Sequence, residues 1–381
     1  MKQISFLIKP ASSLCNLRCR YCFYADVAEN REVANLGLMS AGTAEALIRA
    51  AFQEAEPEDL VSFAFQGGEP TVAGLEYFRQ FTATVDELRP RRVGVTYSIQ
   101  TNGLAVDEQW ADFFRERGFL VGFSVDGDKS LHDRLRPDAR GEGTYDRAVK
   151  TVRLLRERGV EVNLLCVVTG SCARHPRQVY AALKGLGVGY LQFIPCLDPL
   201  GEERGKAPHS LRPKDYGGFL CGLFDLWYRD WEQGQYVSVR LFDDYVHLAM
   251  GLPAGTCATA GSCGSYFVAE GDGSLYPCDF YVLDQWRLGR VGEAPLKELA
   301  ESGRAKAFLD EGARKPDDCG RCRWFSLCNG GCKRDWCEEN GGLKNYYCPS
   351  FRQFFEYAAP RLRNIARLEA SARAGDGAHK G

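Results

Sequence analysis

The stretch CNLRCRYC, residues 15–22, places three cysteines in a C-x3-C-x2-C spacing directly after the first apolar segment of the chain. Three thiols, those of Cys15, Cys19 and Cys22, are one too few for a closed four-ligand site. A cubane 4Fe-4S cluster is usually held by four thiolates, so three leave one iron able to bind a further molecule. A zinc site would want a fourth ligand, and no histidine with ligand spacing lies near. The spacing therefore favours an iron-sulfur cluster with one open iron.

The composition agrees with a metal-binding protein of a reducing compartment. Of the 381 residues, 48 are Lys or Arg and 50 are Asp or Glu, which gives a net charge of -2 with no concentrated basic tract. We therefore expect no nucleic-acid partner and no membrane partner. Neither a signal peptide nor a run of about 18 apolar residues is found. Sixteen cysteines in such a chain indicate metal ligation in a cytoplasmic protein, and not disulfides.

From residue 3 to about residue 234, short β-branched or aromatic runs alternate six times with longer segments of helical period. Such alternation predicts parallel βα units. The expected strands are 3–11, 60–66, 92–101, 119–126, 160–169 and 188–196. The expected helices are 40–56, 73–89, 107–117, 144–158, 174–186 and 212–233. Six units predict an α/β fold in which a partial (β/α)6 barrel, open on one side, spans 1–235.

Polar and glycine-rich groups follow the expected strands, where the chemistry of parallel-strand barrels gathers. The three-cysteine loop follows the first strand, and QGGEP at 66–70 follows the second. Later strands end in polar groups at 100–103, 124–127 and 196–199. Two glycines let the backbone approach a ligand closely, and the Glu69 carboxylate or nearby carbonyls can accept from an ammonium group. A Gly-Gly turn before proline is, however, also an ordinary strand exit.

A second cysteine-rich region begins beyond the domain boundary expected near residue 235. Nine cysteines lie between residues 257 and 348. Such density is hard to explain as packing, whereas cluster ligation supplies folding free energy that a small core lacks. We expect this domain to span 236–370, to end in a helix from about residue 351, and to be followed by a disordered tail, 371–381.

The C-x3-C-x2-C spacing, with Tyr21 before the third cysteine, resembles the signature of the radical SAM superfamily. The later spacing C-x9-G-x4-C, from Cys263 through Gly273 to Cys278, followed by C-x2-C-x5-C-x3-C, resembles the SPASM domain. The first resemblance implies that S-adenosylmethionine (SAM) binds the open iron and is cleaved to a 5'-deoxyadenosyl radical. The second implies two auxiliary 4Fe-4S clusters, and hence three 4Fe-4S clusters in all.

The resemblance also implies which residues bind these cofactors. The first auxiliary cluster would take Cys257, Cys263, Cys278 and Cys332, and the second Cys319, Cys322, Cys328 and Cys348, with Cys337 spare. The residues implied at the SAM site are Tyr24, Gln66, Gly67, Gly68, Glu69, Ser124, Arg136 and Leu197. Ser124 and Arg136 are candidates for the methionine carboxylate, because a guanidinium suits a carboxylate fork. Alternatively, Arg136 is a solvated charge of its loop.

Further stretches resemble the anaerobic sulfatase-maturating enzymes, over residues 3 to about 368. They are IKPASS at 8–13, CFY at 22–24, FAFQGGEPT at 63–71, QFI at 192–194, CLDPL at 196–200, YPCDFY at 276–281 and NYYC at 345–348. Residues 332–337 differ visibly from the pattern of this family, which puts only the assignment of the spare cysteine, Cys337, in doubt. The resemblance implies oxidation of a Cys or Ser, in a Cys/Ser-x-Pro/Ala-x-Arg motif of an unfolded or nascent sulfatase, to Cα-formylglycine. It also implies a low-potential electron donor such as ferredoxin or flavodoxin.

Asp279, directly after the expected ligand Cys278, is the candidate base for the proton that the oxidised substrate releases. An aspartate is ordinarily ionised at neutral pH and can accept that proton. Alternatively, Asp279 only caps a turn. Two other functions stay open. One is a different SPASM peptide maturase that makes thioether or carbon-carbon links, which would usually bring a leader-binding domain. The other is a non-catalytic iron-sulfur electron carrier. The sequence does not distinguish a Cys from a Ser substrate.

Overall fold

The computed structural model describes residues 2–264, 266–339 and 341–378. It divides into two compact units, each built from segments that are far apart in the sequence. Unit one holds Met1–Leu165, Asp198–Glu203 and Gly264–Asp310, and unit two holds Cys166–Leu197, Arg204–Cys263 and Glu311–Gly381. The units interleave along the chain, and the sequence domains 1–235 and 236–370 stay a prediction.

The sheet of unit one begins with parallel strands in chain order. These are β1 (Gln3–Ile8), β2 (Leu60–Phe65), β3 (Gly94–Thr101), β4 (Phe119–Ser124) and β5 (Glu161–Val168), and they pair successively. Each strand falls within the range predicted for it, as does β6 (Tyr190–Pro195) in unit two. The expected α/β fold with a parallel sheet is therefore confirmed.

A segment from the cysteine-rich region extends this sheet on the other side of β1. β8 (Phe267–Ala269) pairs parallel with β1, and β9 (Ser274–Tyr276) and β10 (Gly289–Arg290) follow antiparallel. Lys9 N, just past β1, donates to Ala269 O at 2.8 Å. A small apolar core closes over these elements, made of Leu7, Val27, Val268, Tyr276 and Val282. The residues that follow β8 and β9 consequently lie beside the end of β1.

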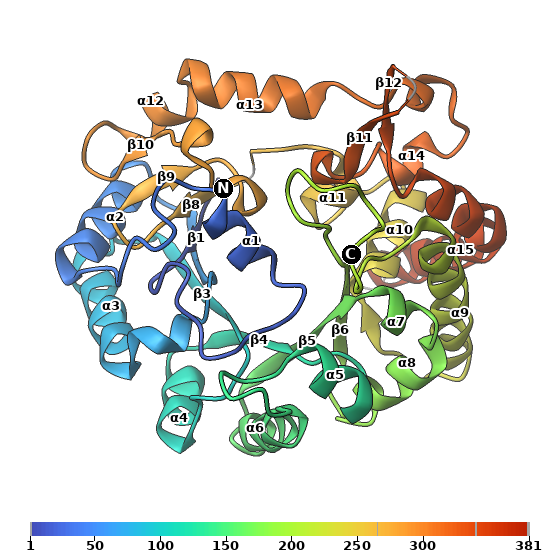
Figure 1. Cartoon of the computed structure of the whole chain (residues 1–381), viewed down its shortest axis with the longest axis horizontal. Helices are drawn as coiled ribbons and strands as arrows, with labels where there is room; N and C mark the ends of the chain where they lie inside the picture. Colours follow the sequence, from blue (N-terminus) through green and yellow to red (C-terminus); the bar gives the residue numbers. More distant parts are fainter. Residues whose placement is uncertain (1, 265, 340, 379–381) are drawn as a thin grey trace. The chain divides into compact units, whose positions relative to one another are not determined.

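Helices flank the sheet of unit one. They are α1 (Phe23–Glu29), α2 (Ala41–Gln53), α3 (Leu75–Leu88), α4 (Glu108–Glu116), α5 (Lys129–Leu135), α6 (Tyr145–Glu157) and α12 (Leu296–Ala300). The periodicity predicts four of them, α2, α3, α4 and α6. Figure 1 shows α2, α3, α4 and α6 along the outer side of β1 to β5. The side chains of Ser40 and Asp107 cap α2 and α4 by accepting from backbone N–H groups in the first turn. The periodicity does not predict the short helices α1 and α5.

Phenylalanine rings fix the centre of this sheet to its helices. Phe63 and Phe65 of β2 are fully buried. Their rings meet the Phe81 ring of α3 edge on, with centroids 5.2 Å and 5.0 Å apart. Edge-to-face pairs contribute about 0.5–1.5 kcal/mol each beyond the burial of the rings. The QGGEP segment at 66–70 therefore starts from a rigid strand.

Unit two consists mostly of helices around a parallel pair, β6 and β7 (Ser238–Val239). The helices are α7 (Gly170–Ala173), α8 (Pro176–Lys184), α9 (Pro213–Glu232), α10 (Arg240–Ala249), α11 (Cys257–Ala260), α14 (Phe325–Cys328) and α15 (Cys348–Ala378). A hairpin joins β11 (Trp336–Glu339) to β12 (Gly342–Asn345), and α13 (Gly303–Ala313) contains a boundary between the units. The Phe354 ring of α15 meets Phe224 of α9 and Phe242 of α10, both at 5.6 Å.

The predicted C-terminal helix is confirmed as α15. The backbone of residues 371–378 continues this helix, and residues 379–381 of the expected disordered tail lie outside the described residues. Short 3-10 turns lie at Pro70–Ala73, Asp279–Tyr281, Asp284–Trp286, Asp317–Arg321 and Lys333–Asp335.

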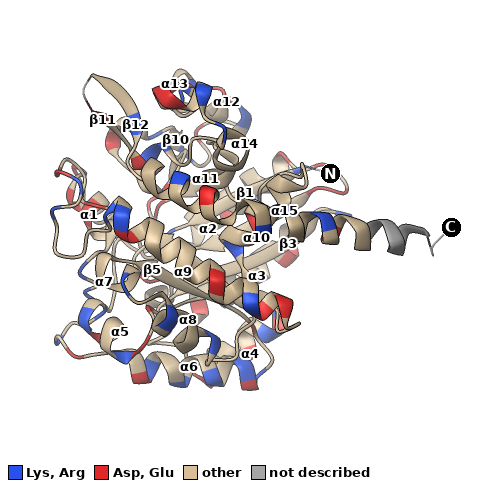
Figure 2. Ribbon diagram, turned by 90° about the vertical axis from the view of Figure 1, so that its right-hand side faces the viewer, with Lys and Arg blue, Asp and Glu red and all other residues tan. Residues whose placement is uncertain are grey.

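Charge is interspersed along the helices, as the sequence predicts. Figure 2 shows both basic and acidic residues on α6. Over residues 2–264, 266–339 and 341–378, the structure contains no helix with the length and apolar character needed to cross a bilayer.

Candidate active site

The three-cysteine loop runs from the end of β1 to the start of α1, and the chain at residues 135–138 holds it in place. Arg18 N donates to Pro137 O at 2.8 Å, and Arg20 N donates to Leu135 O at 2.9 Å. Cys22 directly precedes α1. Protein backbone on both sides therefore sets the path of the loop.

The thiols of this loop interact electrostatically with one another. Burial, together with the nearby charges of Glu69, Cys19 and Cys22, raises the pKa of the Cys15 thiol to about 12. Burial also raises the pKa of Cys19 to about 11, although the Arg136 guanidinium opposes the shift. Thiols must lose their protons to bind metal, and buried thiolates need positive charge beside them. The iron of a cluster supplies that charge, so the three thiols fit the expected cofactor.

A zinc site would gather its ligands around one ion. In the described part of the chain, no three His, Cys, Asp or Glu side chains are grouped so as to hold a metal ion. Zinc would draw each sulfur to about 2.3 Å from one centre. A cubane instead spreads its ligands over separate iron corners, so the thiols can stay farther apart.

Gly68 is required by the close approach of the chain that leads to Cys15. Gly68 N donates to Ser12 O at 2.9 Å, and Glu69 N donates to Leu14 O at 2.7 Å. A Cβ added at Gly68 would lie 2.1 Å from Leu14 O, closer than any real contact allows. The Gly-Gly turn thus anchors the three-cysteine loop. Its expected contact with the SAM amino group stays a prediction.

The Glu69 carboxylate is buried and held by its own neighbours. Oε1 accepts from the Thr71 hydroxyl at 2.6 Å and the Thr101 hydroxyl at 2.7 Å, and Oε2 accepts from Asn102 N at 2.8 Å. Burial raises the pKa of this carboxyl group, and the hydrogen bonds oppose the shift. Each carboxylate oxygen can accept two hydrogen bonds, so Oε2 keeps one position open for an ammonium donor.

Arg136 is buried, so the alternative of a solvated loop charge is wrong. Arg136 is 7% exposed, and its Nη1 donates to the Tyr21 hydroxyl at 2.6 Å. Tyr21 in turn donates to Asp126. The Arg136 Nε is buried and has no hydrogen-bond acceptor among the described residues. Ser124 Oγ, also buried, accepts from Gln100 Nε2 at 3.0 Å. An orphaned guanidinium donor fits the expected methionine carboxylate.

Tyr24, Gln66 and Asp279 come together although they are far apart in the sequence. The Tyr24 hydroxyl lies 2.7 Å from Asp279 Oδ2 and 2.9 Å from Gln66 Oε1. It has one hydrogen, so when it donates to Asp279 the Gln66 amide must present its NH2 group instead. Burial raises the pKa of Tyr24, and the nearby Asp279 carboxylate raises it further. The hydroxyl is therefore a lasting donor to Asp279.

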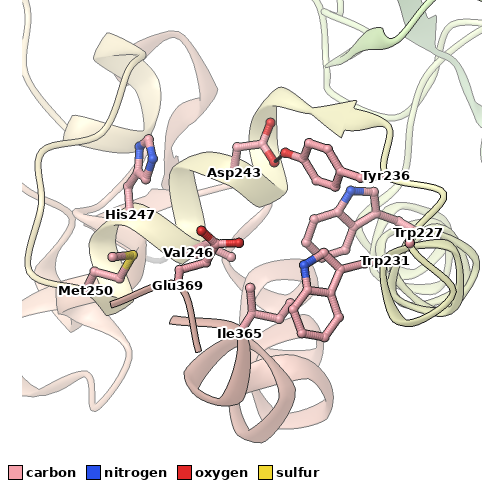
Figure 3. Close-up of a pocket in the computed structure, with 10 residues that line it drawn as sticks. Trp227, Trp231, Tyr236, Asp243, Val246, His247, Met250, Ile365 and Glu369 are labelled. Atoms are coloured by element: carbon pink, nitrogen blue, oxygen red, sulfur yellow. Dashed lines mark hydrogen bonds between the residues drawn. The ribbon is translucent and has the colours of Figure 1, made fainter. Parts of the chain in front are cut away.

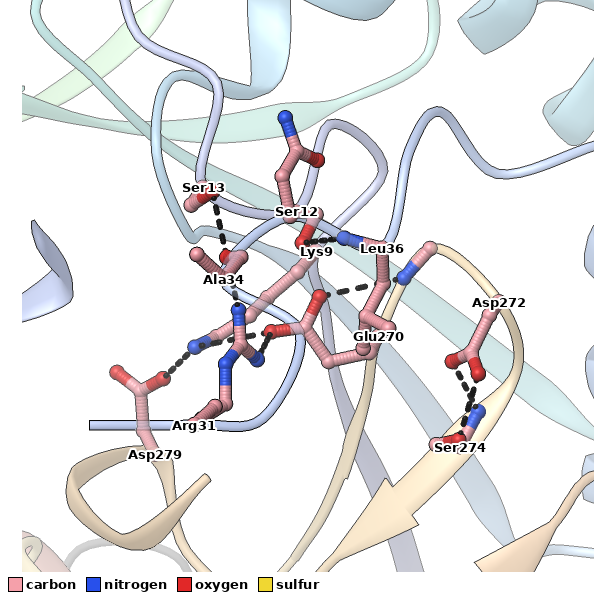
Figure 4. Close-up of polar contacts among 12 residues, drawn as sticks. Lys9, Ser12, Ser13, Arg31, Ala34, Leu36, Glu270, Asp272, Ser274 and Asp279 are labelled. Atoms are coloured by element: carbon pink, nitrogen blue, oxygen red, sulfur yellow. Dashed lines mark hydrogen bonds and ion pairs between the residues drawn. The ribbon is translucent and has the colours of Figure 1, made fainter. Parts of the chain in front are cut away.

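Lys9 also belongs to this group, and the sequence reasoning assigns it no role. Its Nζ lies 3.3 Å from Asp279 Oδ1 and 4.7 Å from the centroid of the Tyr24 ring. Figure 4 shows its ammonium between Asp279 and Glu270. The signal that could have found it is a lysine at the carboxyl end of an apolar strand, where a buried charge needs a partner.

The cysteines of the second expected auxiliary cluster interact electrostatically with one another in unit two. Burial raises the pKa of Cys328 to about 12, and the charges of Cys348, Cys319 and Cys322 contribute to the shift. Burial also raises the pKa of Cys337, whose charged neighbours are Arg204, Glu339 and Lys344.

The first auxiliary set and Leu197 stay predictions. Cys257, Cys263 and Cys332 belong to unit two, whereas Cys278 belongs to unit one. Leu197 follows β6 in unit two.

A cavity of about 420 Å³ lies in unit two between α9, α10 and α15 (Figure 3). Its walls include Trp227, Trp231, Tyr236, Asp243 and Met250. It contains none of the residues predicted to bind a cluster or SAM.

Two family models match the chain. The model of the radical SAM superfamily matches residues 10–180, and that of an iron-sulfur cluster-binding domain, SPASM, matches residues 262–323. The second match begins just before Cys263, the first cysteine of the spacing that resembles SPASM.

Relatives match over nearly the whole length. A cysteine-type anaerobic sulfatase-maturating enzyme of Clostridium novyi is 44% identical over 97% of this chain and 99% of its own. A serine-type enzyme of Klebsiella pneumoniae is 32% identical over 95% of this chain and 89% of its own. The solved structure of native anSMEcpe with bound AdoMet (SAM) and Cp18Cys peptide is 44% identical, with a TM-score of 0.91 over 96% of this chain and 99% of that one.

We predict that Gly68→Ala displaces the three-cysteine loop, because the new Cβ meets a backbone oxygen that cannot move alone. Overpacking of this kind costs about 1–3 kcal/mol. Thermal unfolding under anaerobic conditions and the iron content per chain measure the effect. Gly42→Ala in α2 is the matched control, since its nearest heavy atom would lie 3.9 Å away. Wild-type stability and iron content in Gly68→Ala would contradict the anchoring role.

Proposed function

Because this chain belongs to the anaerobic sulfatase-maturating enzymes, we propose that a sulfatase cysteine is oxidised to Cα-formylglycine beside Tyr24, Gln66 and Asp279. The chain is a radical SAM enzyme of the cysteine type, and it makes formylglycine on sulfatase peptides. Its cofactors are SAM and iron-sulfur clusters. The partly buried hydrogen bond between Tyr24 and Asp279 is the observation that carries the assignment of the site.

The proposed substrate is an unfolded or nascent sulfatase polypeptide with a Cys-x-Pro/Ala-x-Arg motif. Preference for cysteine over serine is supported by the higher identity to the cysteine-type relative, 44% against 32%. A low-potential donor such as ferredoxin or flavodoxin would supply electrons. Clusters held by free thiols favour a reducing cytoplasm as the place of action.

The oxidation of cysteine defines what the residues must do. When SAM is bound and reduced, it would supply the radical that removes one hydrogen atom from the substrate Cβ. The substrate must then release one proton and one electron to become a thioaldehyde. Water replaces the sulfur, and the products are the aldehyde and hydrogen sulfide. The chain must therefore provide a base for the proton and a route for the electron.

We assign Asp279 as the base that accepts the proton released by the substrate. Its Oδ2 accepts from Tyr24, whereas its Oδ1 is buried and accepts no hydrogen bond from the described residues. Oδ1 lies 3.3 Å from Lys9 Nζ, and it keeps a lone pair that can accept a substrate proton. Tyr24 and Gln66 orient the carboxylate, as partners of a catalytic base commonly do. The alternative, a turn cap, is not supported by the side chain, because among the described residues Oδ2 accepts from the Tyr24 hydroxyl and Oδ1 accepts no hydrogen bond from a backbone N–H group.

We assign the auxiliary clusters as the acceptors of the electron that the substrate releases. Three 4Fe-4S clusters would be held by Cys15, Cys19 and Cys22, by Cys257, Cys263, Cys278 and Cys332, and by Cys319, Cys322, Cys328 and Cys348. Fully ligated clusters have no open iron, so they suit electron transfer.

A paired peptide assay tests the function. The protein is incubated anaerobically with SAM, reductant and a sulfatase-motif peptide that carries Cys or Ser. We expect the Cys peptide to lose about 18 Da and to react faster than the Ser peptide, which would lose about 2 Da. Cleavage of SAM without either mass change would favour another SPASM maturase. No cleavage of SAM by the reduced protein would favour an electron carrier.

Iron content tests the cluster assignment. Three clusters give about twelve irons per chain, and replacement of Cys15, Cys19 and Cys22 by Ala should leave about eight. Cys348→Ala should lower the iron content, and Cys337→Ala is the matched control that should leave it unchanged. About four irons in the intact, anaerobically reconstituted protein would refute the two auxiliary clusters. The reverse behaviour of the two single variants would show that Cys348 is the spare thiol.

Asp279→Asn separates SAM cleavage from product formation. The change keeps the size of the side chain and removes its charge, so 5'-deoxyadenosine should still form. Formylglycine should fall about 100- to 10,000-fold, the usual contribution of a general base. Chromatography of 5'-deoxyadenosine and mass spectrometry of the peptide, from one reaction, measure both. Wild-type rates of both products would exclude Asp279 as the base, and loss of both together with iron would mean a structural role.

A further inference from the structure

The carboxylate that we assign as the base belongs to a cluster of four buried charges (Figure 4). Lys9 Nζ lies 3.3 Å from Asp279 Oδ1 and 3.7 Å from Glu270 Oε1, and Arg31 Nη1 lies 2.7 Å from that same Glu270 oxygen. The four side chains are 1–8% exposed. Two positive and two negative charges make the set neutral.

Three of these four charged residues follow the ends of strands. Lys9 follows β1, Glu270 follows β8, and Asp279 comes shortly after β9. The bond from Lys9 N to Ala269 O fixes the first two ends against each other. Gly67, with φ +111°, leaves room for the lysine stem, because a Cβ there would lie 3.0 Å from Lys9 Cγ. The ammonium therefore has one position, between the two carboxylates.

We propose that Lys9 is a positioning residue that holds Asp279 for its reaction with the substrate. The proposal rests on the proposed function of Asp279 as the base. The ammonium draws Oδ1 to one side while the Tyr24 hydroxyl holds Oδ2, so the carboxylate is fixed at both oxygens. Its contact with the Tyr24 ring fixes the ammonium relative to both partners.

Glu270 and Arg31 make a change of charge at Asp279 tolerable. A buried charge that loses its only partner destabilises the protein strongly. When Asp279 takes up a proton its negative charge disappears, but Lys9 still has Glu270 within 3.7 Å. Arg31 remains bound to Glu270 and to Ala34 O at 2.7 Å. The ammonium is therefore never left without a carboxylate during the reaction.

Substitution of Lys9 tests the proposal through the yield of formylglycine per 5'-deoxyadenosine. Lys9→Met keeps the stem and removes the charge, and we expect the yield to fall about tenfold, a part of the roughly 100- to 10,000-fold that a well-placed general base contributes. Lys9→Arg restores a cation and should recover most of the yield. Lys9→Met combined with Asp279→Asn should be no worse than Asp279→Asn alone, because coupled residues are not additive.

Iron content and the unfolding midpoint, measured for every variant, separate positioning from folding. Lys2→Met, an exposed lysine just before β1, is the matched control and should equal the wild type. If Lys9→Met loses iron, Lys9→Met with Glu270→Gln keeps one positive and one negative charge, and its yield should still fall.

The two failures can be told apart. A normal yield in the folded Lys9 variant, or a further loss in the double variant with Asp279→Asn, overturns the role of Lys9. A normal yield in Asp279→Asn overturns the role of the base itself, whatever Lys9 does.

Discussion

The pairing of β8 with β1 is the constraint on which the candidate active site depends. β1 leads directly into the three-cysteine loop, and β8 and β9 bring Glu270 and Asp279 to its end from more than 250 residues away in the chain. One strand therefore positions both the cluster thiols and the assigned base. Without this pairing, the cluster thiols and the assigned base would belong to separate parts of the sheet.

Close packing and charge balance then hold this corner together. The missing side chain of Gly68 lets the chain before Cys15 pass within hydrogen-bonding distance, and that of Gly67 leaves space for the stem of Lys9. Burial of charge is unfavourable unless every charge has a partner. Lys9, Arg31, Glu270 and Asp279 meet this condition as a group, which no pair of them would do equally well once a proton moves.

Much of the fold could be predicted because it follows from local patterns. The six strands and the helices after them repeat with periods of 2 and 3.6 residues over lengths that leave a clear signal. β8, β9 and β10 have two or three residues each, too few for a period to be read. Their partners are set by contacts between distant segments, which no local window contains. The short helices α1 and α5 escape prediction for the same reason of length.

By itself the sequence determined the three-cysteine loop, the nine later cysteines and the order of the six main strands along the chain, whereas Asp279 became a candidate base through the reaction that the family resemblance implies. The loop, the cysteines and the strand order depend on residue type and spacing along the chain. The tertiary structure decided that Arg136 is buried against Tyr21, that Tyr24 contacts both Gln66 and Asp279, and that Lys9 lies beside Asp279. The environment of a charged side chain depends on which strands pair and what they bury, and that is settled only when distant parts of the chain pack together.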